Sequence, residues 1–180
     1  MKSIRIVIAD DHHLIRMGII ALLNANDGFT VVGHSGDGEE SLQLIDEHKP
    51  DIALVDLTMP GITGFQMLAR VRDLGLPTRS IALSMHATPE YIHSAMRQGA
   101  SGYVVKTAAP EELDLAIRTV RKGGLWLPSA ISREMVETFL EQASKNMDLT
   151  TRQATVLKMT VEGRRTKEIA FALGISVKTV

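Results

Sequence analysis

Short apolar runs alternate with amphipathic stretches over the first two thirds of the chain. The apolar runs are rich in Val, Ile and Leu, which is typical of strands buried on both faces of a parallel sheet. The predicted strands are residues 4–9, 30–33, 52–55, 80–84 and 102–105. Between them, apolar residues recur at helical spacing, and the predicted helices are 13–25, 37–48, 64–74, 89–98 and 110–122. This alternation predicts a doubly wound α/β domain around a five-stranded parallel sheet.

The alternation ends after the pair Gly123-Gly124. A helix is predicted from residue 129 to about 142, followed by a polar linker over 143–146. Helical periodicity then returns in residues 151–162 and 166–173, and a third helix is predicted to begin at Val177, after a three-residue turn. We therefore expect a small, incomplete all-α helix-turn-helix element. The predicted domains are 1–123, a linker with a helix over 124–147, and 148–180.

Composition and charge describe a globular chain with two unlike parts. The 180 residues are 44% hydrophobic and 23% charged, which excludes a disordered or fibrous class. The net charge of −1 conceals an uneven distribution, because residues 148–180 hold six basic and three acidic groups. The absence of Cys excludes disulfides, thiolate zinc sites and Cys nucleophiles. No apolar run approaches the roughly 18 residues that span a bilayer, so we expect a cytoplasmic protein without membrane contact.

Polar and charged residues follow four of the five predicted strands. Because parallel strands deliver their carboxyl ends to one edge of the sheet, these side chains should meet there. Carboxylates crowded together repel one another unless a cation neutralises them, and oxygen ligands alone favour Mg²⁺ over Zn²⁺. A lysine beside such a site suits a phosphoryl oxygen, so the set predicts phosphoryl transfer with Asp56 as nucleophile. The residues concerned are Asp10, Asp11, Asp56, Ser84 and Lys106.

Each of these residues also has a simpler interpretation. Asp10 or Asp11 taken alone is typical of a helix N-cap, Ser84 alone of a turn and Lys106 alone of a solvated lysine. The placement of all five residues on one predicted edge favours the functional interpretation. A flavodoxin-like flavin enzyme shares the fold, but adjacent aspartates after the first strand would repel the FMN phosphate. His12 and His13 are expected to be exposed rather than metal ligands, since three carboxylates already serve a hard cation. His86 is expected to be a loop residue rather than a catalytic base.

Residues 3 to about 123 resemble the receiver domain of two-component response regulators. The resemblance rests on motifs in the same order and spacing: Asp10-Asp11, Leu54-Val55-Asp56-Leu57-Thr58-Met59-Pro60-Gly61, Ser84 and Gly102-Tyr103-Val104-Val105-Lys106. It implies a flavodoxin-like fold and a phosphoacceptor that receives its phosphoryl group from a sensor histidine kinase, not a turnover enzyme.

The resemblance also implies a role for each site residue. Asp56 would accept the phosphoryl group, while Asp11, Asp56 and the backbone carbonyl of Thr58 would bind Mg²⁺ and Asp10 would hold it through water. Lys106 would pair with the phosphoryl group, and Ser84 would hydrogen-bond it and draw in Tyr103 as the switch. Met85 is bulkier than the family's usual residue at this position, and from Met85 and Thr58 we expect slow loss of the phosphoryl group.

Residues 149–180 resemble the start of a LuxR/NarL-type helix-turn-helix. The matching residues are Leu149-Thr150, Arg152, Val156-Leu157, Glu162-Gly163, Lys167-Glu168-Ile169-Ala170, Leu173-Gly174-Ile175-Ser176 and Lys178-Thr179-Val180. By this resemblance Lys167, Lys178 and Thr179 would contact promoter DNA in a full-length form, and phosphorylation would control homodimerisation and transcription. The reading helix has only four residues here. The alternative is a phosphorylation-switched signalling module that acts through protein contacts only.

Overall fold

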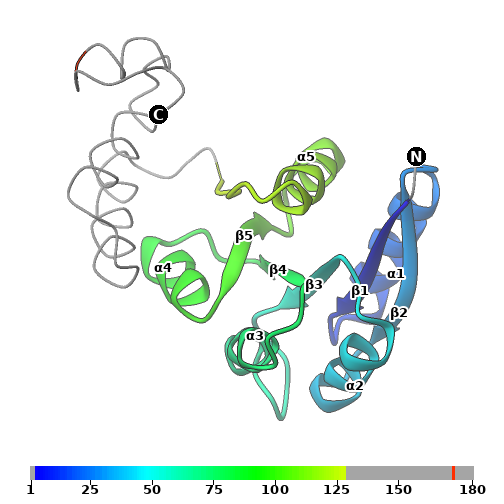
Figure 1. Ribbon diagram of the computed structural model, residues 1–180, viewed down its shortest axis with the longest axis horizontal. Helices are drawn as coiled ribbons and strands as arrows, with labels where there is room; N and C mark the ends of the chain where they lie inside the picture. Colours follow the sequence, from blue (N-terminus) through cyan, green and yellow to red (C-terminus); the bar gives the residue numbers. More distant parts are fainter. Residues whose placement is uncertain (1–2, 129–171, 173–180) are drawn as a thin grey trace. The chain divides into compact units, whose positions relative to one another are not determined.

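Strands and helices alternate along the described part of the chain in a computed structural model, which describes residues 3–128 and 172 (Figure 1). The strands are β1 (Ile4–Ala9), β2 (Phe29–Ser35), β3 (Ile52–Asp56), β4 (Arg79–Ser84) and β5 (Ala100–Val105). The helices are α1 (His13–Asn24), α2 (Gly38–His48), α3 (Gly64–Asp73), α4 (Pro89–Arg97) and α5 (Pro110–Arg121). The helix predicted over 129–142 and the helix-turn-helix element lie outside the described residues.

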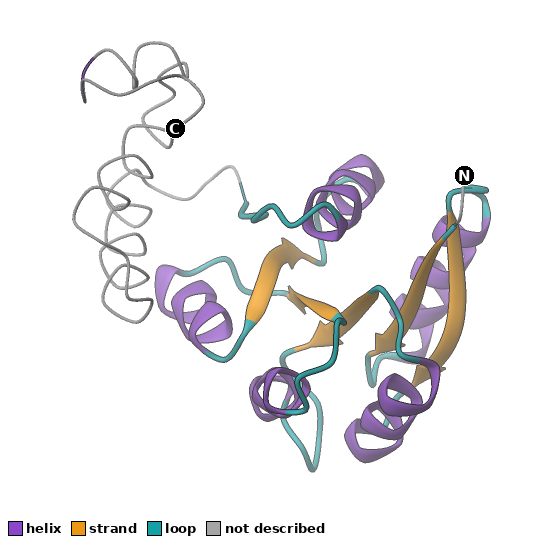
Figure 2. Ribbon diagram, viewed as in Figure 1, coloured by secondary structure: helices purple, strands orange, loops and turns teal. Residues whose placement is uncertain are grey.

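The five strands form one parallel sheet in the order β2-β1-β3-β4-β5, which confirms the predicted doubly wound fold. Helices cover both faces of the sheet (Figure 2). Helices α1 and α5 pack on one face, where Leu23 and Ile117 join the side chains of the strands in a single hydrophobic cluster. Helices α2, α3 and α4 contact one another in turn on the opposite face. Strands β1, β3 and β4 are apolar runs because both of their faces are buried, whereas the edge strand β2 is partly exposed.

Side-chain hydrogen bonds and backbone conformation determine where several helices begin and end. Thr63 and Gln66 form a reciprocal capping box at the start of α3, and the Asp37 side chain accepts a hydrogen bond of 2.9 Å from the Glu40 amide at the start of α2. Helix α2 ends at Lys49, a left-handed residue with φ 42°. Strand β2 is longer than its prediction of 30–33 because it pairs with β1 along the whole strand, up to the pair Ala9 and Ser35.

The chain that leaves α5 returns to the sheet. The amide of Tyr103 donates to the carbonyl of Trp126 at 2.9 Å, and the amide of Trp126 donates to the carbonyl of Ser101 at 3.2 Å. Gly102 and Trp126 thereby form a parallel β-bridge on the outer edge of β5. The Trp126 side chain packs against the hydrophobic cluster, so this segment closes one edge of the sheet.

Candidate functional site

Four predicted site residues meet at the carboxyl edge of the sheet. Asp10 directly follows β1, Asp56 ends β3, Ser84 ends β4 and Lys106 directly follows β5. Asp10 and Ser84 are fully buried and Asp56 is 1% exposed. The prediction that these residues share one edge is confirmed, because neighbouring parallel strands end together there.

Lys106 bridges two buried carboxylates. Its Nζ atom lies 2.8 Å from Asp10 Oδ2 and 2.8 Å from Asp56 Oδ2, and its side chain is only 2% exposed. Its backbone amide donates to the carbonyl of Ser84 at 2.8 Å, which fixes the start of the following loop. A lysine held in this way is not the solvated residue of the alternative interpretation. It offsets part of the repulsion between the two carboxylates.

The backbone after β3 holds the Asp56 carboxylate in place. The amide of Thr58 donates to Asp56 Oδ1 at 3.1 Å, while the Thr58 side chain is exposed. Helix α3 begins against the same peptide: an added Cβ on Gly64 would lie 2.0 Å from the carbonyl oxygen of Asp56. Only glycine permits this approach, so Gly64 is part of the support of the site, although sequence reasoning assigned it to a helix start alone.

His12 lies closer to the acidic residues than the sequence predicted. Its side chain is 55% exposed, as expected, but its Nδ1 lies 2.9 Å from Asp11 Oδ1 and 3.5 Å from both Asp10 Oδ1 and Asp56 Oδ2. His13 is exposed and its ring contacts Arg16 instead. Neither Asp10 nor Asp11 is the N-cap of α1, because that position is His12. The contact of His12 with all three carboxylates was missed, and its adjacency to Asp11 was the only signal for it.

Arg16 is a second residue that sequence reasoning missed. From the first turns of α1 its guanidinium donates a short hydrogen bond to the backbone carbonyl of Asp10 and also approaches the ring of His13. This contact fixes the chain between β1 and α1. Nothing in the spacing of Arg16 distinguishes it from an exposed helical arginine.

Three carboxylate oxygens of the site are buried and accept no well-directed hydrogen bond from the described residues: Asp10 Oδ2, Asp11 Oδ1 and Asp56 Oδ2. Such oxygens are costly in a folded protein unless a cation lies beside them. Lys106 supplies one positive charge against three carboxylates. The acidic cluster therefore fits a hard divalent cation.

Ser84 and Tyr103 lie on neighbouring strands beside the carboxylates. The Ser84 hydroxyl oxygen accepts a hydrogen bond of 3.1 Å from the His86 amide, and the Tyr103 hydroxyl donates to the His86 carbonyl at 2.7 Å. Tyr103 is fully buried, and this burial raises the pKa of its phenol above the ordinary value. His86 is an exposed loop residue whose ring packs on Tyr91, and Met85 is 55% exposed.

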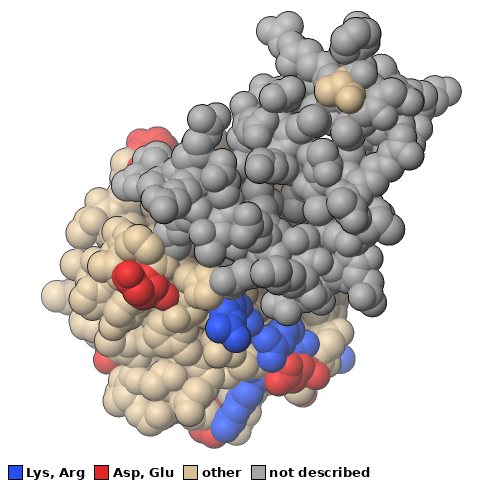
Figure 3. Space-filling model, turned by 90° about the vertical axis from the view of Figure 1, so that its left-hand side faces the viewer, with Lys and Arg blue, Asp and Glu red and all other residues tan. Residues whose placement is uncertain are grey.

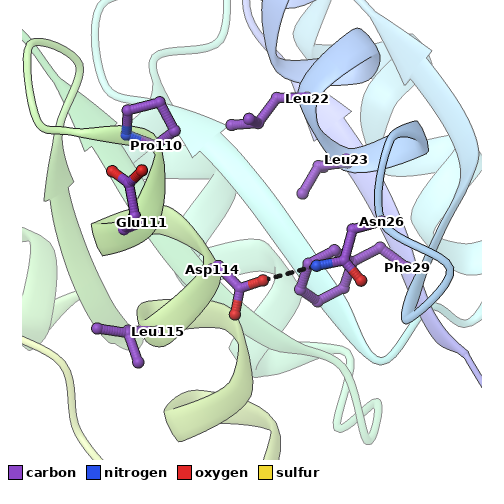
Figure 4. Close-up of a pocket in the computed structure, with 8 residues that line it drawn as sticks. All are labelled: Leu22, Leu23, Asn26, Phe29, Pro110, Glu111, Asp114 and Leu115. Carbon is purple, nitrogen blue, oxygen red and sulfur yellow. Dashed lines mark hydrogen bonds between the residues drawn. The ribbon is translucent and has the colours of Figure 1, made fainter.

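A groove lies between α1 and α5, and both apolar and polar side chains line it: Leu22, Leu23, Asn26, Phe29, Pro110, Glu111, Asp114 and Leu115 (Figure 4). Its volume is about 420 Å³, and the Asn26 amide donates to Asp114 Oδ2 at 2.9 Å across it. Apolar side chains stay exposed on the same two helices: Leu14 (86%), Met17 (42%), Leu22 (36%) and Leu115 (52%). A smaller cavity of about 220 Å³ between the two helices is lined in part by Lys106, the residue that contacts Asp10 and Asp56.

Basic and acidic side chains are mixed on the face of the described part that Figure 3 shows, without a broad region of one sign. The predicted DNA-contact residues Lys167, Lys178 and Thr179 lie outside the described residues. Within the part that the structure describes, no helix is both long and apolar enough to cross a membrane.

Comparison with known proteins identifies both parts of the chain. Residues 6–118 match the family model of the response regulator receiver domain, and residues 147–180 match that of bacterial regulatory proteins of the luxR family. The oxygen regulatory protein NreC of Staphylococcus aureus (strain JH9) is 37% identical over 185 residues, which cover 98% of this chain and 85% of NreC.

Solved structures give the same result. The receiver domain of the NarL response regulator from Mycobacterium tuberculosis is 39% identical with a TM-score of 0.66, covering 68% of this chain and 99% of that one. A structure of two RcsB dimers bound to two parallel DNAs is 25% identical with a TM-score of 0.68, covering 99% of this chain and 86% of that one. With a receiver fold, an acidic strand-end site and a luxR-family segment, the chain belongs to the two-component response regulators that regulate transcription, and it is not a turnover enzyme.

Proposed function

We propose that Asp56 is the phosphoacceptor. The observation that carries this proposal is the contact of Lys106 Nζ with the buried carboxylates of Asp10 and Asp56 at 2.8 Å each. A carboxylate oxygen of Asp56 attacks the phosphorus of a phosphohistidine in a sensor histidine kinase. The new O–P bond forms as the P–N bond breaks, and the imidazole leaves with the bond's electron pair. The product is an aspartyl phosphate.

The chain's own residues prepare this transfer. The Thr58 amide orients the Asp56 carboxylate from one side, and Lys106 faces its other oxygen. Asp11, Asp56 and the backbone carbonyl of Thr58 are the proposed Mg²⁺ ligands, with Asp10 holding the ion through water. When bound, Mg²⁺ offsets the negative charge that accumulates on the transferring phosphoryl oxygens. The buried oxygens without hydrogen bonds at Asp10, Asp11 and Asp56 support this assignment.

Ser84 and Tyr103 are the proposed switch. We assign the Ser84 hydroxyl as a donor to the phosphoryl group. Its oxygen accepts the His86 amide at 3.1 Å, so a movement of Ser84 toward the phosphoryl group draws the His86 peptide with it. The loop that follows Ser84 then shifts, and Tyr103 responds because its hydroxyl is bound to the His86 carbonyl in the same loop. The phosphoryl group is thus coupled to a buried aromatic ring through two hydrogen bonds.

Phosphorylation is proposed to control the association of two copies of the chain. The groove between α1 and α5, with its exposed Leu22 and Leu115, is the proposed contact surface. Lys106, which contacts Asp10 and Asp56, also lines the small cavity beside α1, and this shared residue supports a link between the acidic site and the helix pair. Dimerisation would position two DNA-binding regions on promoter DNA, with Lys167, Lys178 and Thr179 among the contact residues. The similar protein RcsB, solved as two dimers bound to two parallel DNAs, supports a dimer as the DNA-binding form.

The proposed domains are a receiver over 1–123, a linker over 124–147 and a helix-turn-helix region over 148–180. The match of residues 147–180 to the luxR family favours DNA binding over a module that acts through protein contacts only. The two functions differ in one observable: binding of the phosphorylated chain to promoter DNA, which should weaken as salt concentration rises.

Phosphorylation of Asp56 is tested by labelling with acetyl phosphate or a histidine kinase, in Mg²⁺ and in EDTA. We expect label on the wild type only when Mg²⁺ is present, and none on Asp56→Asn. Asp46→Asn is the matched control, since Asp46 is exposed on α2. Label that persists in Asp56→Asn at the wild-type level would remove Asp56 from this role.

A further inference from the structure

The imidazole of His12 lies at the solvent-facing mouth of the acidic site. Its Nδ1 lies 2.9 Å from Asp11 Oδ1 and 3.5 Å from oxygens of Asp10 and Asp56. One ligand atom from each of the four residues lies within 4.8 Å of the others. Two ligand atoms bound to one metal ion at about 2.1 Å are separated by at most roughly 4.2 Å, so only a small adjustment is needed to place all four around one ion.

The backbone directs His12 toward the carboxylates. Its amide donates to Asp10 Oδ1 at 2.8 Å, and as the N-cap of α1 it has extended dihedrals of φ −80° and ψ 95°. The next residue, His13, enters the helix and its ring contacts Arg16 at 3.3 Å rather than any of the three carboxylates. Two adjacent histidines therefore have different environments, which makes His13 a matched control for His12.

The charges of the site suit a divalent ion at this position. Three carboxylates and the Lys106 ammonium carry a formal charge of −2 together. Lys106 is 2% exposed and His12 is 55% exposed, and both approach Asp56 Oδ2, at 2.8 Å and 3.5 Å. The Lys106 ammonium lies 2.8 Å from Asp10 Oδ2 and from Asp56 Oδ2, and His12 Nδ1 is the group beside Asp11 Oδ1, at 2.9 Å. All three oxygens are buried, and one ammonium does not neutralise three carboxylates.

We propose that His12 supplies a nitrogen ligand, through Nδ1, to the cation site of the proposed phosphotransfer function. The inference rests on that function for the location of the site, and it adds a ligand to the oxygen donors assigned above. An imidazole nitrogen favours borderline transition ions such as Co²⁺, Ni²⁺ and Zn²⁺, whereas it adds little to Mg²⁺ binding. The site should therefore prefer Co²⁺ over Mg²⁺ more strongly than an all-oxygen site does.

The test uses the full chain, Co²⁺ and Mg²⁺ as the two probes, and the variants His12→Asn and His13→Asn. Calorimetric titration gives the ratio of the Co²⁺ and Mg²⁺ dissociation constants for each protein. We expect His12→Asn to lower the preference for Co²⁺ by about tenfold or more, and His13→Asn to leave it unchanged. Proton NMR of the Co²⁺ form should show a hyperfine-shifted imidazole N–H resonance that is lost only in His12→Asn.

An unchanged preference in His12→Asn, or a wild-type Co²⁺ form without an imidazole resonance, would overturn the proposal. So would the loss of the preference in both variants to the same extent. The NMR readout on the wild type decides the question even if a variant is unstable. Mg²⁺-dependent labelling of Asp56 is measured in parallel to separate the two proposals. If the wild type is labelled but His12→Asn does not change the metal preference, only the proposal of a nitrogen ligand is contradicted. If the wild type is not labelled in Mg²⁺, the assignment of Asp56 as the phosphoacceptor is contradicted instead.

Discussion

The same substitution, Gly to Ala, should have opposite effects at two positions of this fold. At Gly64 a new Cβ would lie 2.0 Å from the Asp56 carbonyl oxygen, 2.6 Å from the Leu57 Cα and 2.7 Å from the Asp56 carbonyl carbon, whereas real Cβ contacts stay above 3.0 Å. These obstacles are backbone atoms, which cannot rotate away as a side chain does. At Gly18, in α1, a new Cβ meets no atom within 4 Å.

The magnitudes follow from these distances. In Gly64→Ala the start of α3 and the Asp56 peptide must separate by about 1 Å, and overpacking of this kind costs at least about 2 kcal/mol of the free energy of unfolding. The same shift displaces the Asp56 carboxylate, and misplacement by about 1 Å can slow a reaction roughly a hundredfold. Gly18→Ala should stabilise the protein by about 0.5–1 kcal/mol, because Ala replaces Gly in an open helical position.

Urea denaturation followed by tryptophan fluorescence measures both effects. Trp126 is the chain's single tryptophan, and its backbone pairs with β5, so its emission reports on unfolding of the sheet. Acetyl-phosphate labelling of the folded variants gives the rate of phosphorylation. A Gly64→Ala protein whose free energy of unfolding lies within about 0.5 kcal/mol of the wild type would refute the steric argument, since ordinary surface substitutions fall in that range.

Three further predictions concern the site. Lys106→Met should lower the free energy of unfolding in EDTA by about 3–5 kcal/mol, because buried carboxylates lose their partner, and Mg²⁺ should restore part of it in urea titrations. Burial raises the pKa of Tyr103, so its contribution to stability is present below about pH 10 and is lost as the pH rises beyond it. The loss of stability at alkaline pH should therefore be less steep in Tyr103→Phe than in the wild type, measured by urea denaturation at a series of pH values. Purified phospho-Asp56 should lose its label slowly, and a lifetime of seconds in a time course would contradict the roles inferred for Thr58 and Met85.

The fold could be predicted from the sequence because its strands and helices differ in the local spacing of their apolar residues. Strands buried on both faces appear as uninterrupted apolar runs, and strand-to-helix order determines the direction of the sheet. The strand-end residues Asp10, Asp56, Ser84 and Lys106 were predictable for the same reason, since parallel strands bring their carboxyl ends together without any information about loops.

The parts that were missed depend on loop and backbone geometry. The turn before α1 brings His12 over the carboxylates, and the start of α1 brings Arg16 to the Asp10 carbonyl. Neither follows from the spacing of residues. The role of Gly64 depends on the separation between a helix start and a neighbouring peptide, which periodicity does not record. The groove between α1 and α5 depends likewise on how two helices pack on the sheet.

The pairing of Trp126 with β5 sets a minimum length for any receiver fragment that is to be produced alone. A fragment that ends at residue 123 would remove the partner of the Tyr103 amide and of the Ser101 carbonyl, and would uncover the outer side of β5. An uncovered edge strand can pair with the same strand of another molecule, so such a fragment would be prone to self-association. Oligomers of that fragment would mix pairing of the uncovered β5 edge with the proposed association through α1 and α5, whereas a fragment that extends through Trp126 and Leu127 keeps that edge paired.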